Sequence, residues 1–200
     1  AVWHKYNPDI AICAGDMLIA RAFGILSYLT QETKIGACLR MMREVTETTI
    51  EGQSADINRQ TWQNLSTTEY CNTVALKSVP LLQICMAMPL YYAGFNMNDQ
   101  MLCNVFKPFA SAYQILDDIE DWQQDYARER CNYLSLLSKD FNEYCHSDVY
   151  RVAFDDVEAL LSNSECNESQ LPSELIGLMA PFTLRLKLKM QALQREQAYD

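Results

Sequence analysis

A short acidic run at residues 117–121, with the sequence D-D-I-E-D, has the clearest chemical meaning in the chain. On a helix, Asp117 and Asp121 lie one turn apart on one face, and Gln114 lies one turn earlier. Like charges at this spacing destabilise a bare helix, whereas a hard divalent cation between them reverses the sign of the interaction. Because proteins hold magnesium with one or two carboxylates, waters and phosphate oxygens, the pair predicts a site for Mg²⁺ and a diphosphate. The simpler alternative is a solvated acidic helix face.

Lys77 and Ser78 interrupt an apolar helical stretch between Leu76 and Val79. A lysine in such a position is costly unless its ammonium group is paired. One explanation is that the side chain extends along the apolar surface to reach solvent. The functional explanation is that the cation and the hydroxyl bind a substrate phosphate.

A glycine inside a helical stretch marks a third segment, E-G-Q-S-A-D at residues 51–56. Glycine within a helix costs about 1 kcal/mol relative to alanine, so Gly52 indicates that another helix or a ligand comes close. Gln53 and Asp56 are three residues apart and share a helix face. A polar helix end is the alternative interpretation.

Helical periodicity dominates the chain that must position these residues, and no run with the two-residue alternation of a strand stands out. We therefore predict one all-α domain over residues 1–200, a bundle of long helices around one core. A loop is expected near residues 61–67. The expected helices cover approximately residues 10–26, 32–58, 67–93, 98–122, 133–138, 148–161 and 173–197.

Three of these helices have features that predict how they pack. The helix near residues 10–26 is apolar on nearly all sides, which is typical of a buried central helix. Pro80 and Pro89 are expected to kink or break the third helix. Arg185, Lys187 and Lys189, which stand among leucines in the last helix, are expected on a solvated face.

Composition narrows the function classes. Two hundred residues with a formal charge of −10 form a globular chain without the basic footprint that nucleic-acid binding needs. The eight cysteines contain no C-x-x-C pair and stand mostly in apolar contexts, so we expect buried thiols in a reducing, cytoplasmic compartment. No run of 18 apolar residues occurs and the N-terminus has no signal-peptide pattern, so no transmembrane segment is expected.

Taken together, the segments resemble the trans-prenyltransferases, also called polyprenyl or isoprenyl diphosphate synthases. Residues 113–121 are similar to that family's second aspartate-rich motif, F-Q-x-x-D-D-x-x-D. Residues 14–23 are similar to its A-G-D-x-L-L-x-x-A-F helix, and residues 52–56 to its G-Q-x-x-D. Tyr70 with the K-S pair seven residues later is similar to its tyrosine and K-T pair. The resemblance extends over residues 1 to about 137.

This resemblance implies an isoprenoid-synthase-type bundle around a central cavity, and a Mg²⁺-dependent homodimeric enzyme. It would condense an allylic diphosphate with isopentenyl diphosphate into a longer trans-polyprenyl diphosphate. The implied metal ligands are Asp117 and Asp121, supported by Asp118. The implied catalytic residues are Asp117, Asp118, Asp121 and Lys77, and the implied substrate-binding residues are Lys77, Ser78, Gln114, Gln53, Asp56 and Arg130.

The sequence departs from the family pattern at two places. The first D-D-x-x-D is absent, and residues 1–6 resemble the stretch that follows the family's R-R-G-x-P. We therefore expect a longer native polypeptide, and weak binding of magnesium and diphosphate by these 200 residues alone. After Asp121, the segment that usually ends in D-x-x-x-G-K-T-x-P is shortened, with Arg130 at a lysine position and Leu134 at the proline position.

Two other functions remain open at this point. A class I terpene cyclase or a head-to-head synthase would use the same bundle and metal chemistry; the shortened segment after Asp121 favours it, and the absence of N-D-x-x-S-x-x-x-E disfavours it. A non-catalytic subunit of a heteromeric synthase would explain the absence of the first aspartate-rich motif.

Overall fold

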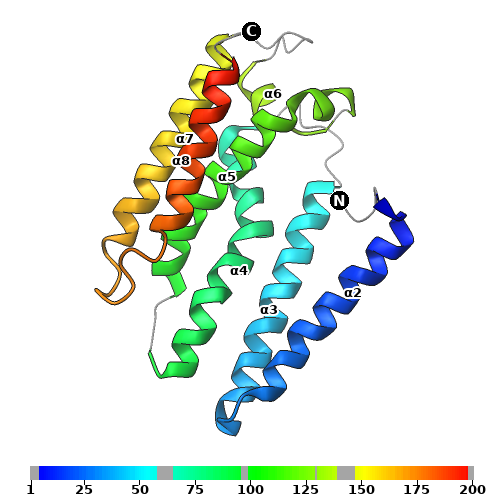
Figure 1. The fold of residues 1–200 in the computed structure, drawn as a ribbon, viewed down its shortest axis with the longest axis vertical. Coiled ribbons are helices and arrows are strands. Elements are labelled where there is room, and N and C mark those ends of the chain that lie inside the picture. Colours follow the sequence, from blue (N-terminus) through cyan, green and yellow to red (C-terminus); the bar gives the residue numbers. More distant parts are fainter. Residues whose placement is uncertain (1–4, 58–64, 96–98, 129, 139–146, 198–200) are drawn as a thin grey trace.

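The computed structural model of the protein describes residues 5–57, 65–95, 99–128, 130–138 and 147–197 (Figure 1). All regular structure in these ranges is helical, which confirms the all-α prediction. The elements are α2 (Pro8–Ile25), the 3₁₀ turn η1 (Leu26–Tyr28), α3 (Glu32–Ile57), α4 (Thr67–Ala93), α5 (Asp99–Ala127), α6 (Tyr133–Leu137), α7 (Ser147–Glu168) and α8 (Ala180–Gln197). The expected loop at 61–64 and the expected helix ends at Asn58 and Asn98 lie outside the described residues.

Helix α4 begins and ends where its sequence signals predict. Ser66 and Glu69 form a capping box, in which each side chain accepts a hydrogen bond from the other residue's backbone N–H. Gly94 ends the helix in the left-handed conformation, with φ of 94°. Neither Pro80 nor Pro89 breaks the helix, because α4 continues through both, so of the expected kink or break the break is wrong and the kink stays a prediction. Each proline removes one backbone donor, and packing of α4 between α3 and α5 holds the helix together.

The core is built around α5, which lies between α4 and the α7–α8 pair (Figure 1). Thirteen of its residues are buried, including Leu102, Ile115 and Leu116, which are fully inaccessible to solvent. The helix extends to Ala127, five residues beyond its expected end. The last two helices also differ from expectation: α7 continues to Glu168, and α8 begins at Ala180.

Helix α2 is not the buried central helix that its apolar composition predicts. It lies at the edge of the molecule beside α3 (Figure 1), and none of its residues is buried. Met17, Leu18 and Ile25 expose 55%, 66% and 63% of their surface. An apolar composition indicates that a helix favours burial, but it does not specify the partner, and the described chain does not cover this helix.

Two further expectations meet mixed outcomes. Cys38 is buried, but Cys13, Cys85 and Cys166 are exposed free thiols, so the expectation of buried cysteines is wrong for these three.

Residues 8–28 and α4 are long and apolar enough to cross a membrane, judged by length and composition alone. This is weak support for membrane crossing, because core helices and signal sequences pass the same criterion. The expectation of no transmembrane segment therefore stays a prediction.

Candidate functional site

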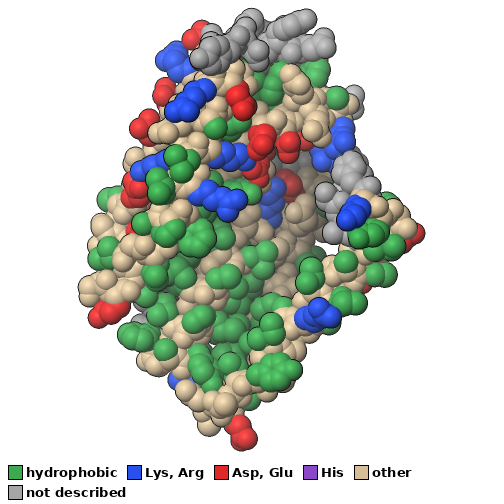
Figure 2. All heavy atoms as spheres, viewed as in Figure 1, with side chains coloured by type: hydrophobic (Ala, Val, Ile, Leu, Met, Phe, Trp, Pro, Cys, Tyr) green, Lys and Arg blue, Asp and Glu red, His purple; other side chains and the backbone are tan. Residues whose placement is uncertain are grey.

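A polar cavity of about 580 Å³ lies between α3, α4, α5 and the segment that precedes α6. On the face shown in Figure 2, charged side chains gather over the upper half of the molecule and hydrophobic ones over the lower half. Eight of the nine site residues predicted from the sequence line this cavity. They are Gln53 and Asp56 from α3, Lys77 from α4, Gln114, Asp117, Asp118 and Asp121 from α5, and Arg130.

Gly52 allows α3 and α4 to approach each other beside the cavity. A Cβ atom at this position would lie only 2.6 Å from the backbone carbonyl carbon of Leu76 and from the backbone nitrogen of Lys77. The prediction of a close approach is confirmed, and its partner is a helix backbone. The contact brings Asp56 within reach of Lys77, whose Nζ lies 3.0 Å from the Asp56 carboxylate. This pairing holds the ammonium group at the cavity wall.

Asp118 is the buried centre of a hydrogen-bond network. Its carboxylate accepts hydrogen bonds from the Tyr70 hydroxyl at 2.7 Å, the Tyr133 backbone N–H at 2.7 Å and the Gln114 side-chain amide at 2.9 Å. Asn132 donates to the Asp118 backbone carbonyl at 2.8 Å. Burial raises the pKa of Asp118 to about 6, although the three hydrogen bonds to its carboxylate lower this pKa. Asp118 therefore joins α4, α5 and α6 from inside.

The other two aspartates of the motif are more accessible. Asp121 is exposed, whereas Asp117 is half-buried and forms an ion pair with Lys189 of α8 at 2.5 Å. Lys189 also lies 2.7 Å from Glu120. Burial opposes the charge of this lysine, but the two carboxylates outweigh it and raise the pKa of Lys189 above its usual value.

Ser78 is the predicted site residue that does not line the polar cavity. It lines a neighbouring cavity of about 520 Å³, whose lining includes Leu81, Leu82, Phe109, Phe182 and Leu186. Lys77 lines both cavities, so its ammonium group marks their boundary. A polar space and a largely apolar space therefore adjoin at Lys77, and Arg185 and Lys189 are two further cations in the lining of the apolar one.

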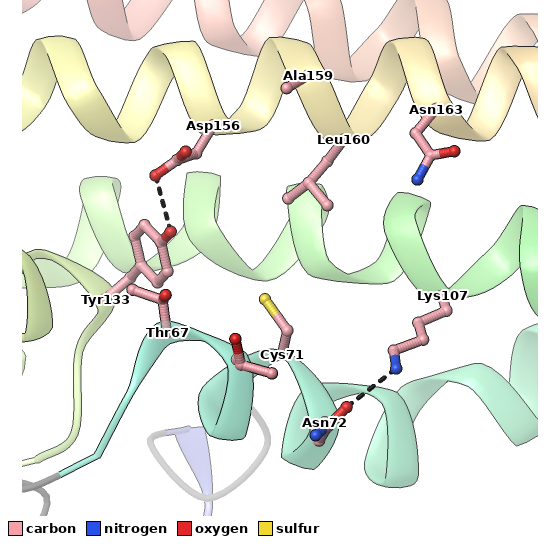
Figure 3. Close-up of a pocket in the computed structure, with 10 residues that line it drawn as sticks. Thr67, Cys71, Asn72, Lys107, Tyr133, Asp156, Ala159, Leu160 and Asn163 are labelled. Carbon is pink, nitrogen blue, oxygen red and sulfur yellow. Dashed lines mark hydrogen bonds between the residues drawn. The ribbon is translucent and has the colours of Figure 1, made fainter.

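A third cavity, of about 400 Å³, lies between α4, α5 and α7 (Figure 3). The Tyr133 hydroxyl points toward α7 and donates to Asp156 at 2.8 Å, and Lys107 of α5 donates to Asn72 of α4 at 2.9 Å. Cys71 also lines this space, and burial raises the pKa of its thiol. Tyr133 donates to Asp118 through its backbone N–H and to Asp156 of α7 through its hydroxyl. Tyr133 therefore links the buried carboxylate of Asp118 to helix α7.

The sequence of residues 1–132 matches the family model described as polyprenyl synthetase. The chain belongs to this family. The match covers all three long helices that wall the polar cavity, α3, α4 and α5, and it ends just before α6. No solved structure matches the chain at a significant level.

Two curated proteins are similar to this chain over more than half of its length. The geranylgeranyl diphosphate synthase of Sulfolobus acidocaldarius is 32% identical over 120 residues, which cover 58% of this chain and 36% of the relative. The short chain isoprenyl diphosphate synthase of Methanocaldococcus jannaschii is 26% identical over 117 residues, with the same shares of each chain. The chain thus matches about a third of the length of these relatives.

The side chains of the polar cavity fit a magnesium ion held jointly with a substrate. Five carboxylates and two cations line the cavity, and its net negative charge favours cations. Across the described ranges, no three Asp, Glu, His or Cys side chains converge into a complete metal cage. Magnesium commonly takes one or two carboxylates and completes its shell with waters and phosphate oxygens. Asp117 and Asp121 are the two carboxylates that could supply that share beside a diphosphate.

Two residues of the site, Asp125 and Lys189, are not among the site residues predicted from the sequence. Asp125 lines the cavity and accepts a hydrogen bond from Asn132 at 3.1 Å. It stands one helical turn after Asp121, so a longer predicted helix would have found it. Lys189 was assigned to a solvated face. It is 72 residues away from Asp117 in the chain, and no local pattern predicts their contact.

Proposed function

We propose that the protein is a Mg²⁺-dependent prenyltransferase that condenses an allylic isoprenoid diphosphate with isopentenyl diphosphate into a longer trans-polyprenyl diphosphate. The observation that carries this proposal is the convergence, in one cavity, of Asp117 and Asp121 from α5 with Lys77 from α4 and with Arg130. A cavity lined only by carboxylates would favour any cation, and a cavity lined only by cationic side chains would favour any anion. Their combination favours a metal-bound diphosphate. Membership of the polyprenyl synthetase family supports the same reaction.

Five of the predicted residues have a role that their position allows. Asp117 and Asp121 would hold Mg²⁺, which neutralises the charge that develops on the departing diphosphate. Lys77 and Arg130 would bind the diphosphate oxygens directly. Asp118 faces three protein donors, so it acts by fixing the motif rather than by touching the substrate.

The neighbouring apolar cavity accommodates the hydrocarbon part of the substrate. Lys77 borders both cavities, so a diphosphate bound there would place its isoprenoid chain against Leu81 and Phe109. The allylic carbon–oxygen bond breaks and its electron pair leaves with the diphosphate. The resulting carbocation is attacked by the double bond of isopentenyl diphosphate, after which a proton is lost. Apolar walls exclude water that would otherwise capture the cation.

The proposal extends to a homodimer in the cytoplasm, with residues 1–200 in a single helical domain. The exposed apolar side chains of α2 support self-association.

Class I cyclisation or head-to-head condensation is the second candidate. The short connection of α5 to α6, between Ala127 and Tyr133, favours it.

Product analysis separates these reactions. The intact protein is incubated with an allylic diphosphate, labelled isopentenyl diphosphate and Mg²⁺, and the products are identified by mass spectrometry. Elongated prenyl diphosphates support the proposal, whereas cyclic hydrocarbons or head-to-head products support the second candidate.

Asp117→Ala is expected to lower kcat by roughly 10²-fold or more, because metal-mediated charge stabilisation is worth several kcal/mol. Asp155→Ala on α7, which removes an exposed carboxylate, is the matched control; equal rates for both variants would contradict the role of Asp117.

A further inference from the structure

Helix α8 places a lysine on the aspartate-rich motif of α5. Lys189 Nζ lies 2.5 Å from Asp117 Oδ1 and 2.7 Å from Glu120 Oε2, and 5.8 Å from the centre of the Tyr113 ring. Lys189 stands outside the segment that matches the polyprenyl synthetase family, which ends at residue 132. Its contact with the motif is therefore a feature of this chain that the family match does not cover.

The ammonium group occupies a carboxylate that a metal ion would need. Asp117 is the half-buried acid of the pair that faces the polar cavity, whereas Asp121 is exposed and forms no ion pair within the described ranges. Magnesium is a hard cation that binds carboxylate oxygens directly. Lys189, which contacts Asp117 Oδ1, and Mg²⁺ would therefore compete for the same carboxylate group.

Glu120 gives Lys189 a second partner on the same helix. The Glu120 side chain is more exposed than that of Asp117, at 57% against 32%, and it does not line the polar cavity. When Asp117 turns to a metal ion, the ammonium group keeps a carboxylate partner and α8 keeps its contact with α5. Loss of the Asp117 contact thus leaves no unpaired charge.

We propose that Lys189 is a positioning residue that occupies Asp117 in the metal-free protein and releases it when Mg²⁺ binds, while Glu120 retains the lysine on α5. This inference rests on the proposed function, because it assumes that Asp117 is a metal ligand. Lys189 lowers the affinity for Mg²⁺ alone. Metal binding is then favoured when a diphosphate supplies further oxygen ligands.

The test measures Mg²⁺ binding to the intact protein by isothermal titration calorimetry, without substrate. Lys189→Met keeps the apolar stem and removes the charge. It is expected to tighten Mg²⁺ binding about twofold to fivefold, since a partly exposed ion pair contributes up to about 1 kcal/mol. Lys187→Met is the matched control: it removes the same charge from the same helix, but Lys187 pairs with Glu165 of α7 at 2.6 Å. Lys189→Arg keeps the charge and is expected to give no tightening.

Unchanged or weaker Mg²⁺ binding in Lys189→Met, with a native circular dichroism spectrum, would overturn the proposal, because the lysine would then only tie α8 to α5. Equal tightening in Lys187→Met would also overturn it, because the effect would reflect net charge rather than contact. Asp117→Asn separates this inference from the proposed function. If that variant binds Mg²⁺ as tightly as the wild type, the metal site itself is wrong; if it binds more weakly while Lys189→Met does not tighten, only the role of Lys189 fails.

Discussion

Helices α2 and α5 are both long and rich in apolar residues, yet the fold uses them in opposite ways. Helix α5 contacts α4, α6, α7 and α8 and buries thirteen residues, whereas α2 buries none. The difference lies in the pattern rather than in the amount of apolar surface. The polar residues of α5, among them Gln114, Asp117 and Asp121, fall on one face and direct the opposite face into the core. The nearly uniform apolar surface of α2 specifies no such direction.

The largest expected effect compares one leucine from each helix. Leu116→Ala in α5 removes a fully buried side chain and is expected to lower the free energy of unfolding by about 2–5 kcal/mol. Leu18→Ala in α2 removes an exposed side chain and is expected to change it by no more than about 0.5 kcal/mol. Urea unfolding followed by circular dichroism measures both. Similar losses in the two variants would contradict the contrast between the helices.

The buried polar side of α5 provides the next test. Asp118→Ala leaves the Tyr70 hydroxyl and the Tyr133 N–H without their acceptor, and is expected to cost about 2–4 kcal/mol. Asp118→Asn is expected to cost less, because its side-chain oxygen still accepts from both groups and the Gln114 amide can rotate to accept from its nitrogen. The same unfolding experiment checks the order of the two variants. An alanine variant as stable as the asparagine variant would mean that the network does not stabilise the fold.

Helix α3, which stands between the two regions, is tested through its glycines. Gly52→Ala would place a Cβ atom against the α4 backbone and is expected to cost about 1–3 kcal/mol. It would also separate Asp56 from Lys77 and weaken pyrophosphate binding. Gly36→Ala is the control on the same helix, because its nearest neighbour is the end of the Arg40 side chain at 3.7 Å. That change is expected to stabilise the protein by up to about 1 kcal/mol. Equal destabilisation by both changes would contradict the close approach at Gly52.

A further test is the pH dependence of stability. Because burial raises the pKa of Asp118 from 3.8 to about 6, the folded protein retains a proton over this range that the unfolded chain releases. The contribution of Asp118 to the free energy of unfolding is therefore fully present below about pH 4, and it is lost as the pH rises through about 6. The free energy of unfolding of the wild type, relative to that of Asp118→Asn, is expected to fall over this window. A difference that stays constant between pH 4 and pH 7 would show that the pKa of Asp118 is not raised.

The local parts of this architecture could be predicted from the sequence, because their causes are local. The capping box at Ser66, the left-handed Gly94 and the spacing of Asp117 and Asp121 each depend on residues within a few positions. The close approach at Gly52 was also predictable in kind, since a helical glycine marks a place where a side chain would not fit. Its partner, the α4 backbone, was not.

The missed features depend on contacts between distant segments. The ion pair of Lys189 with Asp117 spans 72 positions, and no periodicity in α8 distinguishes Lys189 from Lys187. The continuity of α4 through Pro80 depends on packing by α3 and α5. Ser78 is adjacent to Lys77 in the chain, yet it lines only the apolar cavity, because successive helical side chains point in different directions.

The central claim is that the cavity between α3, α4 and α5 binds a diphosphate through magnesium. The most direct measurement is a calorimetric titration of inorganic pyrophosphate into the intact protein, with Mg²⁺ and with EDTA, for the wild type, Asp117→Asn, Lys77→Met and the control Asp155→Asn. The account predicts binding that requires Mg²⁺, that is weakened at least about tenfold in the Asp117 and Lys77 variants, and that is unchanged in the control. Pyrophosphate binding that is equally strong in EDTA, or unaffected by Asp117→Asn, would contradict it.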